Sequence, residues 1–280
     1  MRITVIILLI LKYSFPIKYN NYIFSVENYL SGGFLKYNSP GLVKEIIQEL
    51  KKLLAENESD FTLLYDYGNA LMNDFRYDEA IPILEKALSL KDNNKIRLSL
   101  GFAYKSVRKF DKAVKHFKVC VEKNPQYADV HYHLAECLND MGKADEAIEE
   151  YMKSLYINPD YVEALYSLGD LYRQMGMLEE TLELYKRIID NNIILKKDFT
   201  DITIVQYDLA YLYTEKALFD DAIKHLENIA ARHPEYADVH FKLGKLFKKK
   251  GETKRAMEEF ETAIRINPNY RDARDEYWDM

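Results

Sequence analysis

A proline–tyrosine phrase that returns at a fixed spacing constrains the fold of this chain more than any other feature. Pro125 and Pro159 are 34 residues apart, as are Pro234 and Pro268, and a tyrosine stands two residues after each proline. A period in the 30s is typical of stacked helix pairs, because one pair cannot bury its apolar face alone. The phrase therefore predicts an all-helical array and leaves little chain for a catalytic domain.

Composition supports a helical chain and argues against several functions. Among 280 residues, 48% are hydrophobic, and there are only seven prolines and ten glycines. The net charge of −6 predicts no broad basic surface for nucleic acid. The sequence contains no glycine-rich phosphate loop, nucleophile elbow or metal motif. We therefore expect a protein that is not an enzyme and needs no cofactor or metal.

The first residues form a separate hydrophobic segment. Arg2 precedes an apolar run from Ile3 to Leu11, which Lys12 ends. Nine residues are too few to span a bilayer, but a basic start and a short apolar run fit the beginning of a secretory signal. No small-x-small cleavage site follows. Export or membrane association through residues 1–12 and a cytoplasmic protein with a hydrophobic N-terminal cap both remain open.

Alignment on the 34-residue spacing gives six units with small residues at fixed positions. The units begin at Phe61, Asn94, Ala128, Val162, Thr203 and Ala237. The eighth residue of each unit is small: Gly68, Gly101, Ala135, Gly169, Ala210 and Gly244. The twentieth is alanine in five units: Ala80, Ala113, Ala147, Ala222 and Ala256. Helices approach closely where side chains are small, so each unit is predicted to be an antiparallel hairpin, with larger pairs such as Leu243 and Phe260 filling the rest of its seam.

Signals for helix ends agree with the hairpins. Glycine stands where three first helices should end, in a turn that favours a left-handed backbone: Gly142, Gly176 and Gly251. Aspartate opens four second helices, where it offsets the helix dipole: Asp78, Asp111, Asp145 and Asp220. The recurring prolines should end the second helices, because proline lacks an amide donor.

Positions 8, 20 and 24 and the proline recur together over about residues 61–270. This pattern resembles the tetratricopeptide repeat family. The resemblance implies a right-handed superhelical solenoid of about six antiparallel helix pairs, with a capping helix at each end. It also implies a concave groove that binds peptides or protein segments.

The fourth unit departs from the pattern, and so do the chain ends. Thr181, Ile188 and Ile193 replace the usual small residues and proline, and an insertion follows. An amphipathic helix is expected after Pro40. The predicted parts are a signal-like or membrane-associated segment (1–24), an N-terminal capping helix or degenerate repeat (25–60), units 1–4 (61–194), an irregular insertion or hinge (195–202), units 5–6 (203–270) and a C-terminal cap (271–280).

The family geometry places five positions of each first helix on the concave face. Large aromatic side chains dominate many interfaces, although tyrosine at position 5 is also common in the family as consensus usage. Acidic residues in units 3 and 4 and lysines in unit 6 have two interpretations. They either give this face a charge polarity that a partner recognises, or form a solvated surface of mixed charge. The predicted partner-binding residues are Tyr65, Leu98, Phe102, Tyr132, Glu136, Tyr166, Asp170, Arg173, Tyr207, Tyr211, Phe241, Lys245 and Lys248.

Histidine and cysteine pairs have structural explanations. His131 and His133 point to different faces of a helix, so we do not expect them to share a metal ion. Cys120 and Cys137 lie in successive units, where they are either buried free thiols or a disulfide bridge.

The sequence thus predicts a non-enzymatic scaffold or adaptor that holds protein or peptide segments in a groove, for example during assembly of a multiprotein complex. The alternative is a self-assembling structural subunit of an envelope-associated machine, of the pilus, flagellar motor or magnetosome type. A homo-oligomer would fit that alternative.

Overall fold

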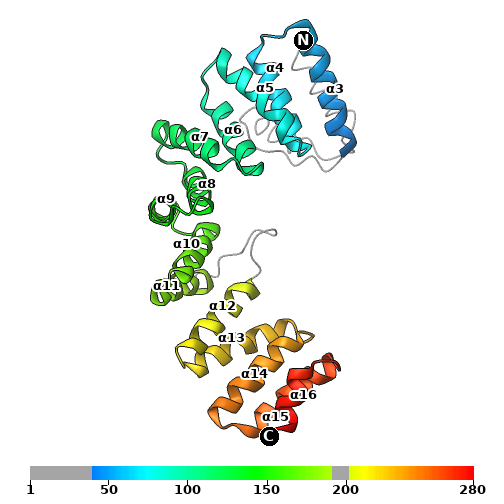
Figure 1. The fold of residues 1–280 in the computed structure, drawn as a ribbon, viewed down its shortest axis with the longest axis vertical. Coiled ribbons are helices and arrows are strands. Elements are labelled where there is room, and N and C mark those ends of the chain that lie inside the picture. The colour runs from blue at the N-terminus through cyan, green and yellow to red at the C-terminus, as the bar shows by residue number, and fades with distance from the viewer. Residues whose placement is uncertain (1–39, 191–201) are drawn as a thin grey trace, which may run out of the picture. The chain divides into compact units, whose positions relative to one another are not determined.

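The computed structural model describes residues 40–190 and 202–280, and every regular element in these two ranges is a helix (Figure 1). The chain divides into two compact units, which are larger than the six repeat units of the sequence analysis and are the units 1 and 2 named from here on. Unit 1 is Met1–Glu150, and unit 2 is Tyr151–Met280. The predicted segment 1–24 lies outside the described residues, as does the insertion 195–202 except for its last residue. No helix in the described ranges is both long and apolar enough to cross a bilayer.

Unit 1 is a series of helices in which each packs against the next along the chain. The amphipathic helix expected after Pro40 is present as α3, which buries Val43, Ile46, Ile47 and Leu50 and packs on α4. The helices are α3 (Pro40–Glu56), α4 (Phe61–Asn73), α5 (Tyr77–Leu90), α6 (Asn94–Ser106), α7 (Phe110–Lys123) and α8 (Ala128–Asp140). α9 (Ala144–Ile157) begins in unit 1 and ends in unit 2.

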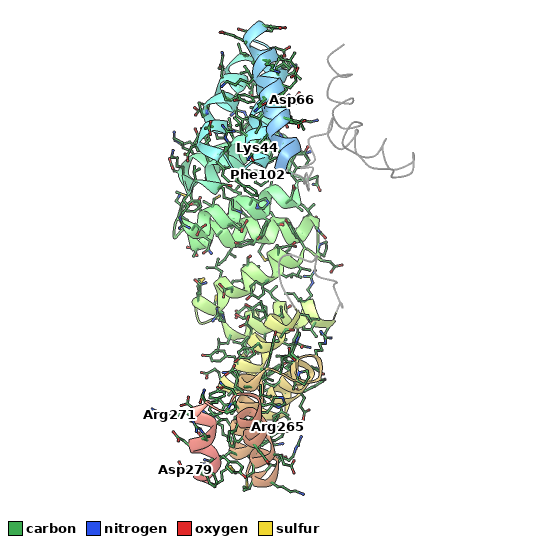
Figure 2. All side chains as sticks on the ribbon, turned by 90° about the vertical axis from the view of Figure 1, so that its right-hand side faces the viewer. Lys44, Asp66, Phe102, Arg265, Arg271 and Asp279 are labelled. Carbon is green, nitrogen blue, oxygen red and sulfur yellow. The ribbon has the colours of Figure 1, made fainter. Side chains whose placement is uncertain are left out.

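Unit 2 continues the same alternation of first and second helices. Its helices after α9 are α10 (Val162–Gln174), α11 (Leu178–Asp190), α12 (Ile202–Glu215), α13 (Phe219–Arg232), α14 (Ala237–Lys250), α15 (Thr253–Ile266) and α16 (Arg271–Trp278). From α10 onward each helix packs against its successor. The final helix, α16, packs on α15 and caps the array, and Figure 2 labels residues at both of its ends.

In four of the six hairpins the seam contains a glycine packed against a large side chain, and in the other two the small residue is Ala135 or Ala210. A Cβ built on Gly101 would lie 2.5 Å from the Phe117 ring, and one built on Gly169 would lie 2.4 Å from the Tyr185 ring. Where position 8 is glycine, it thus packs against the large side chain at position 24 of the same hairpin. The position-20 alanines are themselves completely buried.

The helix ends follow the predicted signals, with one addition. Gly142, Gly176 and Gly251 have φ between 73° and 78°, which is the left-handed conformation expected of them. The other three hairpins make the same turn with residues other than glycine, namely Phe75, Arg108 and Ala217. Each recurring proline follows the end of a second helix; α7, for example, ends at Lys123.

Candidate protein-binding surface

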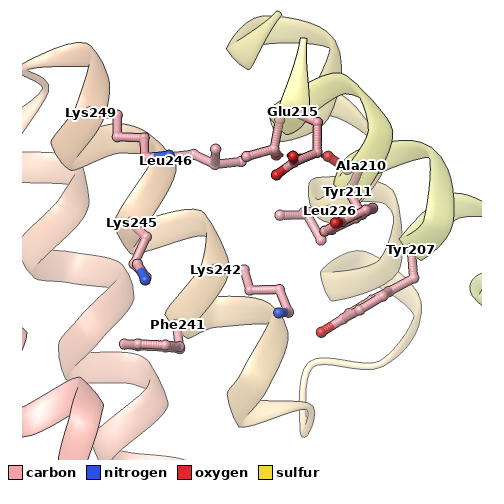
Figure 3. Close-up of a pocket in the computed structure, with 11 residues that line it drawn as sticks. Tyr207, Ala210, Tyr211, Glu215, Leu226, Phe241, Lys242, Lys245, Leu246 and Lys249 are labelled. Atoms are coloured by element: carbon pink, nitrogen blue, oxygen red, sulfur yellow. Dashed lines mark hydrogen bonds between the residues drawn. The ribbon is translucent and has the colours of Figure 1, made fainter. Parts of the chain in front are cut away.

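A pocket in unit 2 gathers four of the predicted partner-binding residues. It lies mainly between α12 and α14, with one residue from α13, and has a volume of about 210 Å³. Figure 3 shows tyrosines from α12 on one wall and residues of α14 on the opposite wall. Its lining residues are Tyr207, Ala210, Tyr211, Thr214, Glu215, Leu226, Phe241, Lys242, Lys245, Leu246 and Lys249.

The aromatic walls of the pocket are held by hydrogen bonds and ring contacts. The Tyr207 hydroxyl donates to Asp238, and the Tyr270 hydroxyl donates to the other oxygen of the same carboxylate at 3.1 Å. The Phe241 ring lies 4.9 Å from the Tyr270 ring and 5.9 Å from the Phe260 ring. Burial, together with the Asp238 hydrogen bond, raises the pKa of Tyr207, so its hydroxyl keeps its proton at neutral pH. These walls exist before any partner arrives.

Three lysines on α14 line the pocket. Lys242 places its ammonium 5.1 Å from the centre of the Tyr207 ring, and Lys245 lies 5.5 Å from that of Phe241. Lys249 lies over Phe219 at 5.6 Å. None of the three forms an ion pair with a carboxylate in the described part of the chain. A carboxylate partner can therefore reach these ammonium groups without displacing an internal one.

The other predicted residues of unit 2 lie outside this pocket and are engaged within the unit. The Tyr166 hydroxyl donates to Asp208 at 3.2 Å, and burial and Asp208 raise the Tyr166 pKa to about 12. Asp170 and Arg173 form an ion pair with each other. Lys248 pairs with Glu276 of α16 at 2.7 Å.

In unit 1, the five predicted residues are buried or half-buried. Tyr132 is only 3% exposed, so its side chain offers almost no area to a partner. Phe102 packs edge-on against His133. Tyr65 and Leu98 are half-buried.

Glu136 is also engaged, because it pairs with Lys105 and with His133 Nδ1 at 2.8 Å. Burial opposes ionisation of Glu136, but these two partners outweigh it and lower its pKa. Its carboxylate is thus ionised and already satisfied inside unit 1.

The two histidines on α8 have different surroundings. His131 is buried, with Nδ1 2.5 Å from Glu150 and Nε2 3.1 Å from the Pro125 carbonyl. His133 contacts Lys105 and Glu136 instead. In the described ranges, no group of three histidine, cysteine or acidic side chains is placed to hold a metal ion.

Both cysteines are buried free thiols in this structure. Burial is the main cause that raises the pKa of Cys120 to about 11 and that of Cys137 to about 12. Each therefore remains a protonated, unreactive thiol at neutral pH.

The sequence pattern missed part of the pocket. Lys242 and Lys249 were not predicted partner-binding residues, although their spacing from Lys245 places all three on one face of α14. Leu226, which contributes the α13 part of the lining, and Asp238, which holds Tyr207, depend on packing between helices. No linear signal identifies those two residues.

Family models match most of the repeat region. Two models described as tetratricopeptide repeat match residues 126–193 and 206–277, which together make up half of the chain. A third, for anaphase-promoting complex, cyclosome, subunit 3, matches residues 73–154. These models belong to families that are generally non-catalytic interaction modules.

Solved structures with similar folds include MamA proteins. A crystal structure of MamA is 26% identical, with a TM-score of 0.53, covering 57% of this chain and 94% of that one. A second MamA structure, labelled MSR-1, is 27% identical, with a TM-score of 0.51, covering 54% and 88%. A tetratricopeptide repeat protein from Parabacteroides merdae covers 85% and 91%, with a TM-score of 0.56; at 19% identity it shows the fold alone.

The recurring hairpins, the glycine seams and the matching family models agree with one another. The chain belongs to the tetratricopeptide repeat family.

Proposed function

We propose that this chain is a non-enzymatic scaffold that binds segments of other proteins, and that the α12–α14 pocket of unit 2 is a principal contact surface. The observation that carries the proposal is the preformed aromatic pocket. Tyr211 is 54% exposed there, although a tyrosine usually buries most of its ring in a folded protein. Exposed aromatic side chains beside a concavity are typical anchors for protein partners.

The scaffold function can be tested by comparing matched tyrosine variants. The full chain serves as bait in cells of its source, captured proteins are identified by mass spectrometry, and the affinity of each is measured by calorimetry. Tyr211→Ala should weaken binding about tenfold or more, because a truncated aromatic anchor costs at least 1–2 kcal/mol. Tyr156→Ala is the control, since Tyr156 is 86% exposed on α9 and does not line the pocket.

Unchanged affinity in both Tyr211→Ala and Tyr207→Ala would show that this pocket is not part of the binding surface. Circular dichroism of each variant checks that the helices remain folded.

A second candidate is a structural subunit that assembles with copies of itself, as in envelope-associated machines. The observation that favours it is α16, a cap of only eight residues that leaves Trp278 79% exposed. An exposed tryptophan at the end of a repeat array is a feasible contact for a neighbouring copy.

A further inference from the structure

We infer that the α12–α14 pocket binds an extended acidic segment of a partner protein, in which one large apolar side chain stands between two carboxylates. This inference rests on the proposed scaffold function and assigns a chemistry to its partner. It follows from the size of the pocket, its unpaired lysines and the direction in which side chains leave an extended backbone.

The size and lining of the pocket suit one apolar side chain. Its volume of about 210 Å³ lies below the 300–1,000 Å³ typical of sites for small molecules and cofactors. Leu226 and Leu246 are almost fully buried and form apolar lining, while the exposed ring of Tyr211 is available to cover an inserted group. A leucine or phenylalanine side chain would therefore remove apolar surface from water on both itself and the pocket.

Charge at the pocket favours an acidic partner. On α14, Lys248 and Lys250 are neutralised by Glu276 at 2.7 Å and Asp220 at 2.6 Å. The pocket lysines have no such partner in the described ranges, although the chain as a whole has a net charge of −6. An array of free cations on one face of an acidic protein attracts carboxylates and selects against basic segments.

Two acidic groups near the pocket define where the partner's carboxylates would lie. Glu215 lines the same end of the pocket as Lys249 and offsets its charge (Figure 3). Asp238, one helical turn before Lys242, already accepts hydrogen bonds from two tyrosine hydroxyls. The three lysines outnumber these two carboxylates, so the pocket keeps a net positive charge to which Lys242 and Lys245 contribute.

Backbone geometry then predicts the order of side chains in the partner. Lys242 and Lys245 are three residues apart on α14, about 4.5 Å along its axis, and Lys249 lies about 6 Å farther. An extended segment advances about 3.3 Å per residue, and its alternate side chains point to opposite sides. Two acids separated by one residue would therefore face α14, about 6.6 Å apart, while the residue between them faces Tyr207 and Tyr211. The expected pattern is acidic–apolar–acidic.

The pocket walls need little reorganisation to accept such a segment. Tyr207 is fixed by Asp238 at its hydroxyl, and Phe241 is wedged between two other rings. Binding energy is then not spent on ordering these side chains.

The test uses the full chain and three fluorescein-labelled peptides that differ only at three central residues. Their flanking glycine–serine sequences are identical, and their centres are Glu-Leu-Glu, Glu-Ser-Glu and Lys-Leu-Lys. We expect fluorescence anisotropy to show that Glu-Leu-Glu binds about tenfold or more tightly than either of the others, and that its affinity falls with added salt. Equal binding of the first two peptides would overturn the inference, because it would mean that only charge is recognised.

Charge-reversal variants locate the site. Lys245→Glu should weaken Glu-Leu-Glu about tenfold and improve Lys-Leu-Lys, whereas Lys254→Glu should change neither. Lys254 is exposed on α15 and lies outside the pocket, so it is a control with the same charge change. Lys242→Gln, a milder change, keeps the test valid if Lys245→Glu disturbs folding. Identical effects of Lys245→Glu and Lys254→Glu would overturn the inference.

The same variants separate this inference from the scaffold proposal. If Tyr211→Ala weakens a natural partner while Lys245→Glu and Lys242→Gln do not, the pocket binds proteins but does not select acidic segments. That result would overturn the inference and keep the proposed function.

Discussion

Some single residues in this protein lower its folding stability, and the repeat pattern does not reveal them. Ala217 adopts the left-handed conformation that three other units assign to glycine. Its neighbours complete the usual helix-ending hydrogen bonds, from the Ala217 amide to the Thr214 carbonyl and from the Leu218 amide to the Tyr213 carbonyl. The turn therefore forms although alanine disfavours the left-handed conformation, because these hydrogen bonds satisfy carbonyl groups at the end of α12.

Replacing Ala217 with glycine should stabilise unit 2 by about 0.5–1 kcal/mol. The left-handed conformation costs an L-residue about 1–2 kcal/mol, and the greater freedom of glycine in the unfolded chain offsets part of the gain. Chemical denaturation measures the difference. The control Ala230→Gly, inside α13, should destabilise the protein by about 1 kcal/mol instead; a loss of stability in both variants would contradict the assigned strain.

Asp66 on α4 should make unit 1 less stable as the pH rises. Burial, with a smaller effect of the nearby Asp60 charge, raises its pKa from 3.8 to about 6. The folded state therefore binds the proton more tightly than the unfolded state. The stabilisation that the bound Asp66 proton gives to the folded state is complete below pH about 4, and it is lost as the pH rises through about 6.

Asp66→Asn should accordingly be more stable than the natural chain at pH 8, by about 1–3 kcal/mol, and similar to it at pH 4. Urea unfolding at the two pH values measures both differences. Glu122→Gln, at an exposed position of α7, should show no such pH-dependent gain. A gain for Asp66→Asn that is equal at both pH values would refute the explanation.

At the scale of helices, the hairpin seam is the element that the sequence predicted best. The small residues of position 8 lie on the faces where paired helices meet, as expected. The sequence did not identify the partner of each glycine, which is the position-24 side chain that fills the space above it. Spacing along the chain identifies which residues share a face, but the axial offset between two antiparallel helices depends on how their side chains interdigitate.

Gly101→Val should test the seam. The added side chain meets the Phe117 ring, which is completely buried and cannot move into solvent. We expect a loss of about 1–3 kcal/mol in unfolding free energy, as for other overpacked cores. Lys95→Val introduces the same β-branched residue at an exposed position of α6, and should change stability by about 0.5 kcal/mol or less. Because valine has a higher helix propensity than glycine, a gain or no change of stability in Gly101→Val would contradict the close packing.

For the molecule as a whole, the two proposed functions predict different masses in solution. A scaffold for other proteins should have the mass of one chain, 33.0 kDa, at every concentration in light scattering. A mass that rises with concentration, and that falls again in Trp278→Ala, would favour the self-assembling subunit.

The sequence by itself determined the repeat architecture, the helix ends and the family, because the 34-residue period and the glycine, aspartate and proline signals act locally along the chain. Only the tertiary structure decided which predicted groove residues are available. Tyr132 is buried, Lys248 is paired with Glu276, and Lys245, beside a pocket, has no ion-pair partner among the described residues. The physical reason is that exposure and ion pairing depend on side chains from other helices, which no single repeat encodes.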